Sequence, residues 1–277
     1  MKETLCRLTE EWYGIKADPD DINKLEEHLL ADGMHNKNLE HVFSSGEAAE
    51  FLTVNETYFF REPVHFALLL ELLSSCNKAA IRICSAATSA GCEAYSIAML
   101  MDAYNKNAEK PVSYTIDAFD INPNTIKKAD HGIYNTRSLR EDGSCFSHIS
   151  DLYIKKNEGG IQIDHGLKNN INFFVHNLMD ELYPEFYDFI FFRNAFIYIL
   201  PDYRERVLSN LASSLKESGY LIMGVSETSG VKHWNLVQKM GRLHSQKEDV
   251  FYFQKNSFQK PAKPEYNKYA LAEQSAG

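Results

Sequence analysis

Charged and polar side chains follow apolar runs of this sequence at points where a ligand could reach them. Arg193 and Asn194 come directly after the run Tyr187–Phe192, and Asp120 comes directly after the run 113–119. A charged pair after a buried strand needs a partner, a ligand or water, because burying a bare charge is unfavourable. A carboxylate such as Asp120 can accept hydrogen bonds from both hydroxyls of a ribose. Capping of the helix that starts at the following Asn-Pro is the other interpretation of Asp120.

Two further segments have compositions that suit a ligand site. Residues 85–96 read Ser-Ala-Ala-Thr-Ser-Ala-Gly-Cys-Glu-Ala-Tyr-Ser, and such small residues let the backbone approach a ligand closely. This is not Gly-x-Gly-x-x-Gly, so it is weak as a dinucleotide motif, and a tight strand-to-helix turn is the plain alternative. Residues 55–61 read Asn-Glu-Thr-Tyr-Phe-Phe-Arg and bring Arg61 beside an aromatic cluster at the junction of two regions, a common location for a cleft.

The elements that would hold these residues alternate between strands and helices. Strands are predicted at 80–84, 113–119, 171–175, 187–192, 220–225 and 250–254. Helices are predicted from Pro63, over 91–105, from Pro123 and over 201–217. This alternation is typical of a doubly wound α/β domain, in which ligands bind beyond the carboxyl ends of the parallel strands. The candidate residues follow the strands at that edge.

The first fifty residues differ in character from the rest of the chain. Apolar positions at helical spacing (Ile22, Leu25 and Leu29) predict a helix that ends near Gly33, and a second helical stretch is predicted over 38–52. Residues 1–52 hold five Lys or Arg against twelve Asp or Glu, which indicates a solvated acidic face. We therefore expect a helical domain over 1–52, an α/β domain over 53–255 and a flexible tail over 256–277.

Composition excludes several classes of protein. With 44% hydrophobic residues the chain can bury a sizeable core, and its net charge of −9 argues against a broadly basic nucleic-acid surface. No apolar run is long enough to span a bilayer, and the N-terminus lacks the apolar stretch of a secretion signal, so we expect a cytoplasmic protein without membrane insertion. The five cysteines and ten histidines show no paired spacing, so reduced thiols and no metal site are expected.

Five segments together resemble the CheR family, the S-adenosylmethionine-dependent methyltransferases that act on glutamates of chemotaxis receptors. The segments are Asn-Glu-Thr-Tyr-Phe-Phe-Arg (55–61), the turn 85–96, Asp-Ile-Asn-Pro (120–123), His-Asn-Leu (176–178) and Arg-Asn-Ala-Phe-Ile-Tyr (193–198), in the family's order over about residues 50–255. The resemblance implies a Rossmann-like α/β methyltransferase sheet with an N-terminal helical domain and a small inserted β-subdomain, for which about 137–170 is the candidate. It also implies S-adenosylmethionine as cofactor, S-adenosylhomocysteine as product, and the cytoplasmic helices of receptors as partner. A monomer is expected.

The resemblance further implies roles for ten residues. The cofactor contacts would fall on Asn55, Thr57, Arg61, Glu93, Asp120, Asn177, Leu178, Arg193 and Asn194. Asp120 would take the ribose hydroxyls, Asn177 and Leu178 would flank the adenine, and Arg61 and Tyr198 would face the methyl-transfer centre. The alternatives are a junction salt bridge for Arg61 and a core position for Tyr198.

Chemistry supports those catalytic roles. A glutamate carboxylate, with a reference pKa of about 4.3, is ionised at pH 7 and needs no general base. A fixed cation such as Arg61 can orient that carboxylate without competing for a proton, and the Tyr198 hydroxyl can hydrogen-bond the acceptor.

The sequence departs from the family pattern in two places, which keeps other functions open. Glu93 stands alone between Cys92 and Ala94, where the family usually has two acids followed by proline, and the first predicted helix is acidic where the family has an arginine-rich one. The alternatives are a cofactor-binding sensor without transferase activity and a methyltransferase that acts on a different protein carboxylate. A nucleotide-dependent oxidoreductase is disfavoured by the missing glycine motif.

Overall fold

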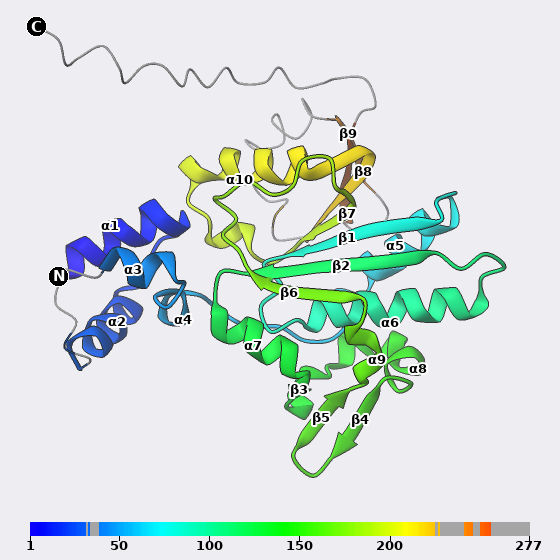
Figure 1. The fold of residues 1–277 in the computed structure, drawn as a ribbon, viewed down its shortest axis with the longest axis horizontal. Coiled ribbons are helices and arrows are strands. Elements are labelled where there is room, and N and C mark those ends of the chain that lie inside the picture. The colour runs from blue at the N-terminus through cyan, green and yellow to red at the C-terminus, as the bar shows by residue number, and fades with distance from the viewer. Residues whose placement is uncertain (32, 34–38, 225–226, 228–240, 246–249, 256–277) are drawn as a thin grey trace, which may run out of the picture.

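The computed structural model of this chain describes residues 1–31, 33, 39–224, 227, 241–245 (backbone only) and 250–255 (Figure 1). The expected flexible tail, 256–277, lies outside the described residues. Within them, no helix is both long and apolar enough to cross a membrane.

A central sheet of seven strands, counted over the described residues, has the order β6-β2-β1-β7-β8-β10-β9. The strands are β1 (Ala80–Ala86), β2 (Ser113–Asp120), β6 (Ile171–Val175), β7 (Tyr187–Phe192), β8 (Leu215–Met223), β9 (Gly241–Ser245) and β10 (Phe251–Lys255). The first five strands of that order run parallel, and β10 is antiparallel to both β8 and β9. The predicted α/β class with a Rossmann-like parallel sheet is confirmed.

Helices cover both faces of this sheet, α6 and α7 on one side and α10 on the other (Figure 1). The covering helices are α5 (Val64–Ser74), α6 (Cys92–Asn107), α7 (Pro123–His131) and α10 (Pro201–Ser214). Side chains of β7 alternate between two cores, as the pleat requires. Phe189 and Phe191 pack with residues of α5 and α6, whereas Ile190 and Phe192 pack with residues of α10. The sheet is thus buried on both faces and presents its strand ends to ligands.

The boundary between α10 and β8 differs from the sequence expectation. The helix ends at Ser214, not at 217, because fully buried Leu215 already pairs with Tyr187 of β7. The pairing then shifts register before Phe189, and Ser218 takes a positive φ of 61° within the irregular stretch. Strand β9 was not predicted.

The N-terminal region is a cluster of helices with a core of its own. The helices are α1 (Lys2–Tyr13), α2 (Pro19–Ala31), α3 (Leu39–Ser44) and α4 (Ala49–Leu52). Helix α1 was not predicted, and the stretch expected over 38–52 is two helices. The break contains Gly46 at φ 79°, where a Cβ would lie 2.6 Å from the carbonyl oxygen of Ile121. The helical stretch is interrupted at Gly46, where the backbone packs closely against the α/β domain.

A second, three-stranded antiparallel sheet lies below the central one in Figure 1. Its strands are β3 (Ile133–Tyr134), β4 (Ile154–Asn157) and β5 (Gly160–Ile163), in the order β3-β5-β4. The short helices around it are η2 (Thr136–Ser138), η3 (Glu141–Phe146), α8 (Ser147–Ser150) and α9 (His165–Lys168). This sheet begins four residues before the expected insertion, and the domain boundaries themselves stay a prediction.

Candidate functional site

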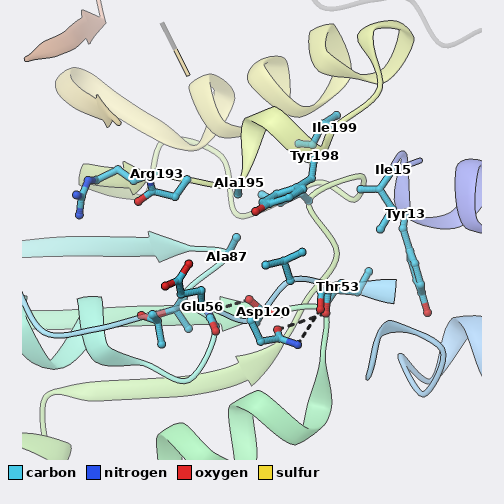
Figure 2. Close-up of a pocket in the computed structure, with 18 of the residues that line it drawn as sticks. Tyr13, Ile15, Thr53, Glu56, Ala87, Asp120, Arg193, Ala195, Tyr198 and Ile199 are labelled. Atoms are coloured by element: carbon cyan, nitrogen blue, oxygen red, sulfur yellow. Dashed lines mark hydrogen bonds between the residues drawn. The ribbon is translucent and has the colours of Figure 1, made fainter. Parts of the chain in front are cut away.

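A cavity of about 420 Å³ lies beyond the carboxyl ends of β1, β2 and β7, where the N-terminal helices meet the sheet (Figure 2). The ten candidate residues all line it: Asn55, Thr57, Arg61, Glu93, Asp120, Asn177, Leu178, Arg193, Asn194 and Tyr198. The parallel topology brings them together, because strands that are remote in sequence end at one edge of the sheet.

The turn after β1 forms one wall of this cavity. Ala87 and Ser89 adopt left-handed backbone angles, with φ of 58° and 53°, and Gly91 follows at φ 83° as the N-cap of α6. Left-handed residues other than glycine are strained and tend to occur at functional sites. The Ser89 N–H donates to Oδ2 of Asp120 at 2.8 Å, which joins the ends of β1 and β2.

Asp120 is only 7% exposed and its two carboxylate oxygens are already engaged by backbone donors. Besides the Ser89 bond, Oδ1 accepts from the Asn122 N–H at 3.0 Å. Burial raises the pKa of Asp120. Helix α7 is capped by Asn122, whose side chain accepts from the Asn124 and Thr125 N–H groups, so the capping interpretation of Asp120 is wrong. Each carboxylate oxygen has further lone pairs for a ligand hydroxyl.

Arg193 lies in the floor of the cavity, 5% exposed, with its guanidinium pointing away from Tyr198 (Figure 2). Its Nη1 donates to Oε2 of Glu93 at 2.9 Å, and its Nη2 donates to the Arg61 carbonyl at 2.5 Å and to Oε2 of Glu62 at 3.2 Å. The other oxygen of Glu93 accepts from the Ser85 hydroxyl at 2.7 Å. Arg193 therefore ties together three segments that line the site.

Asn194, Glu62 and His65 extend this floor. Asn194 takes a φ of 57° and donates from Nδ2 to Oε1 of Glu62 at 3.0 Å. Burial raises the pKa of Glu62, but Arg193 and Asn194 outweigh it and hold that pKa below its usual value. His65 is fully buried beside Glu62, with Nε2 2.9 Å from the Met223 carbonyl oxygen, and burial lowers its pKa to about 4. His65 was not among the predicted residues.

Arg61 and Tyr198 stand where the cavity meets a second one of about 400 Å³. Both residues line both cavities, as do Val54, Glu56 and Asn194. The Arg61 Nη1 donates to the Glu56 carbonyl at 3.2 Å, and among the described residues no carboxylate forms an ion pair with it. Tyr198 is 43% exposed, so the alternative of a core tyrosine is wrong. A guanidinium that forms no ion pair within the described residues, beside an exposed hydroxyl, suits an acidic acceptor.

The remaining candidates line the cavity with side chains that are partly engaged elsewhere. Asn177 donates from Nδ2 to the Trp12 carbonyl at 2.7 Å and accepts from the Met179 N–H at 3.0 Å. Asn55 donates to the Thr53 carbonyl at 3.0 Å, and Thr57 hydrogen-bonds the buried Cys92 thiol. Leu178 packs on the α10 core.

The sequence did not indicate that the N-terminal region walls the cavity. The lining residues from that region are Tyr13, Ile15, Lys16, Asp18, Asp21 and Leu52. Ile15 forms an antiparallel bridge with Ile199, and the Leu200 N–H donates to the Gly14 carbonyl at 2.8 Å (Figure 2). Apolar positions at 5, 8 and 13 before Gly14, which takes φ 66° as C-cap, are the signal that could have located α1.

The cavity has a lining of mixed charge. Five described carboxylates line the cavity (Asp18, Asp21, Glu56, Glu93 and Asp120) against three basic side chains (Lys16, Arg61 and Arg193). Three of these carboxylates are in ion pairs, Asp21 with Lys24, Glu56 with Arg140 and Glu93 with Arg193, so the lining has no net acidic excess. The volume of the cavity falls in the range of small-molecule sites. Over the described part of the chain, no group of three or more His, Cys, Asp or Glu side chains could hold a metal ion.

A family model and several known proteins match this chain. The family model "CheR methyltransferase, SAM binding domain" matches residues 55–243. The chain is 34% identical over 206 residues to a chemotaxis protein methyltransferase of Vibrio parahaemolyticus, covering 72% of this chain and 73% of that protein. It is 33% identical over 215 residues to a chemotaxis protein methyltransferase of Escherichia coli, covering 74% and 73%. A solved SAM-dependent methyltransferase from Aquifex aeolicus is 15% identical, with 68% of this chain and 87% of that one covered and a TM-score of 0.40.

Proposed function

The chain belongs to the CheR methyltransferase family, and from that premise we propose that it transfers the methyl group of S-adenosylmethionine to glutamate carboxylates of chemotaxis receptors. The observation that carries the proposal is the cavity at the strand ends, which Asp120, Arg61 and Tyr198 all line. The relatives named as chemotaxis protein methyltransferases support it, and nothing in them supports an oxidoreductase.

Bound S-adenosylmethionine supplies a sulfonium-activated methyl group, whose transfer to a carboxylate oxygen breaks the S–CH3 bond, leaves its electron pair on sulfur in S-adenosylhomocysteine, and forms a methyl ester. The acceptor carboxylate is already ionised at pH 7, so the protein has no proton to remove. Its residues instead hold the reacting atoms in line and exclude water.

Arg61 and Tyr198 are proposed to orient the acceptor carboxylate. Arg61 has donors that no described carboxylate occupies, and Tyr198 offers an exposed hydroxyl at the junction of the two cavities. If Arg61 and Tyr198 bound the acceptor carboxylate too strongly, they would lower its nucleophilicity. Arg61 therefore orients the carboxylate more than it neutralises it.

Asp120 is proposed to accept the ribose hydroxyls, with Asn177 and Leu178 beside the adenine. Asn55, Thr57, Glu93 and Asn194 complete the proposed cofactor contacts. Arg193 is assigned a supporting part, because its guanidinium is engaged by Glu93, Glu62 and the Arg61 carbonyl. Arg193 fixes the position of the Glu93 carboxylate, and with it a negative charge at the bottom of the cavity.

We propose that the acceptors are glutamates on the cytoplasmic helices of receptors. We also propose that the chain acts as a monomer on the cytoplasmic side of the membrane.

Incubation of the purified chain with radiolabelled S-adenosylmethionine and receptor-bearing membranes tests the function. Base-labile label on a receptor-sized band, lost in R61A and competed by S-adenosylhomocysteine, is the expected result. Label on another protein instead would identify a different carboxylate acceptor. Tight binding of S-adenosylhomocysteine with no labelled protein at all would show a sensor and overturn the proposal.

A further inference from the structure

The aromatic ring of Tyr58 has two guanidinium groups beside it. Cζ of Arg61 lies 5.3 Å from the ring centroid and Cζ of Arg140 lies 4.2 Å from it. Both distances fall within the range of cation–π attraction. Arg61 belongs to the segment that joins the two domains, whereas Arg140 lies 82 residues beyond Tyr58, between η2 and η3. One ring thus links the candidate catalytic cation to a distant segment.

The Tyr58 ring is itself held in place. Its hydroxyl donates to Oδ2 of Asp142 at 3.0 Å, and burial, reinforced by Asp142, raises the pKa of Tyr58, so the hydroxyl stays protonated. Arg140 donates from Nη2 to Oε1 of Glu56 at 2.5 Å. The Asp142 bond fixes the hydroxyl end of the ring, and Glu56, whose carbonyl accepts from Arg61, holds the second cation with its carboxylate.

The backbone directly after Tyr58 is docked closely. The Phe59 N–H donates to the Ser138 carbonyl at 2.9 Å. A Cβ on Gly143 would lie 2.8 Å from the Phe59 carbonyl oxygen, so the two segments touch without room for a side chain. The ring therefore has a defined position relative to residues 138–143.

Arg61 itself is held lightly. Within the described part of the chain, the Arg61 guanidinium donates one hydrogen bond, to the Glu56 carbonyl, and a guanidinium has five N–H donors. Attraction to a ring uses the positive charge of the guanidinium and consumes no N–H donor. Contact with Tyr58 can therefore restrict where Arg61 lies while its donors stay available to a carboxylate.

We propose that Tyr58 is a positioning residue, which holds Arg61 for the acceptor carboxylate and is itself held by Arg140 and Asp142. The proposal rests on the proposed methyl transfer and deepens it, because it assigns part of acceptor recognition to the segment 138–143. Tyr58 acts through Arg61 and needs no contact with the acceptor.

Kinetics of three variants test the proposal, with receptor-bearing membranes as acceptor. Y58L, which removes the ring, is expected to lower kcat/KM for the receptor about fivefold while the Kd of S-adenosylhomocysteine stays within about twofold of wild type. Y58F keeps the ring and is expected to restore most of the loss. Y183L is the matched control, because Tyr183 is 67% exposed and does not line the cavity.

A second measurement does not depend on activity. The aromatic ring current is expected to shift the NMR resonance of the Arg61 Nε–H, assigned from its absence in R61K. Y58L is expected to abolish that shift, Y58F to retain it and R140Q to change it partly. If the wild type transfers no methyl group, the proposed function fails, yet this measurement still tests the contact.

Three outcomes would overturn the positioning role. The first is a wild-type kcat/KM in Y58L, and the second is an equal loss of turnover and S-adenosylhomocysteine affinity in Y58L. The third is an Arg61 Nε–H resonance that is the same in Y58L as in the wild type. An unchanged resonance in R140Q would remove Arg140 from the proposal.

Discussion

Nη1 of Arg193 lies 2.9 Å from Oε2 of Glu93, although the two residues are 100 positions apart in the sequence. The contact joins the end of β7 to the first turn of α6, beneath the cavity. Only 2% of the Arg193 side chain and 15% of the Glu93 side chain are exposed. The ion pair is therefore buried, and each partner depends on the other for its charge to be tolerated.

Replacing Arg193 by methionine is expected to destabilise the fold by about 3–5 kcal/mol, because Glu93 and Glu62 lose their buried cation. Urea unfolding followed by circular dichroism measures this. Arg7→Met is the control, since Arg7 pairs with Glu11 on the surface and its side chain is 60% exposed. That control should lose less than about 1 kcal/mol. Equal losses in the free energy of unfolding of both variants would show that the buried ion pair contributes no more than the exposed one.

Arg61→Ala and Tyr198→Phe are expected to reduce turnover by at least about tenfold while S-adenosylhomocysteine binding persists, because both residues orient the acceptor. Methyl-transfer rates and calorimetric titration of the same preparations separate the two effects. Tyr183→Phe, on an exposed tyrosine away from the cavity, is the control for the hydroxyl deletion. Unchanged turnover in both variants would remove the catalytic assignment.

The location of the site followed from the sequence because it depends on local patterns. A β-branched or aromatic run fixes a strand, and the residue after it lies at the ligand-binding edge of a parallel sheet. That reasoning placed Asp120 and Asn194 correctly at one cavity. This prediction did not require knowing how the helices pack on the sheet.

The bonding of the same residues could not be predicted in that way. The Arg193 guanidinium is engaged by Glu93 and Glu62, and Asn177 by the Trp12 carbonyl, 165 residues away. Such contacts depend on how remote segments pack together in the fold. Neither hydrophobic periodicity nor secondary-structure propensity contains that information. The wall formed by Ile15 was missed for the same reason.

Asp120→Ala is expected to weaken S-adenosylhomocysteine binding roughly 10- to 100-fold, because a charge-assisted hydrogen bond is lost. Burial raises the pKa of Asp120, so the affinity of the wild type should also begin to fall at a higher pH than an ordinary aspartate would give. Calorimetric titration between pH 8 and pH 5 follows both effects. Asp151→Ala, on an exposed aspartate, should bind like the wild type at every pH. A flat profile with undiminished affinity in Asp120→Ala would exclude the ribose contact.

The stability of the protein should depend on the protonation of His65. Its folded pKa of about 4 lies below the reference value of 6.5, because burial disfavours the charged ring. Between these values the unfolded chain binds the proton and the folded chain does not, so stability falls as the pH drops from about 6.5 to 4, by about 3 kcal/mol in all. Urea unfolding of wild type and His65→Gln measures the difference, which should shrink toward low pH. Exposed His148→Gln should follow the wild type, and parallel curves for His65→Gln would contradict the prediction.

The variant Asn177→Ala distinguishes two roles of the Asn177 side-chain amide. If Asn177 acts by tying α1 to the sheet through the Trp12 carbonyl, its loss should loosen the wall at Ile15 and weaken S-adenosylhomocysteine binding. Hydrogen exchange of residues 12–16 should then rise together with the Kd. Asn107→Ala is the matched control, because Asn107 also donates to a backbone carbonyl, that of Ala103, but within its own helix. Weaker binding with unchanged exchange would instead show that the Asn177 side chain meets the adenine directly, since the wall would be intact while the contact is gone.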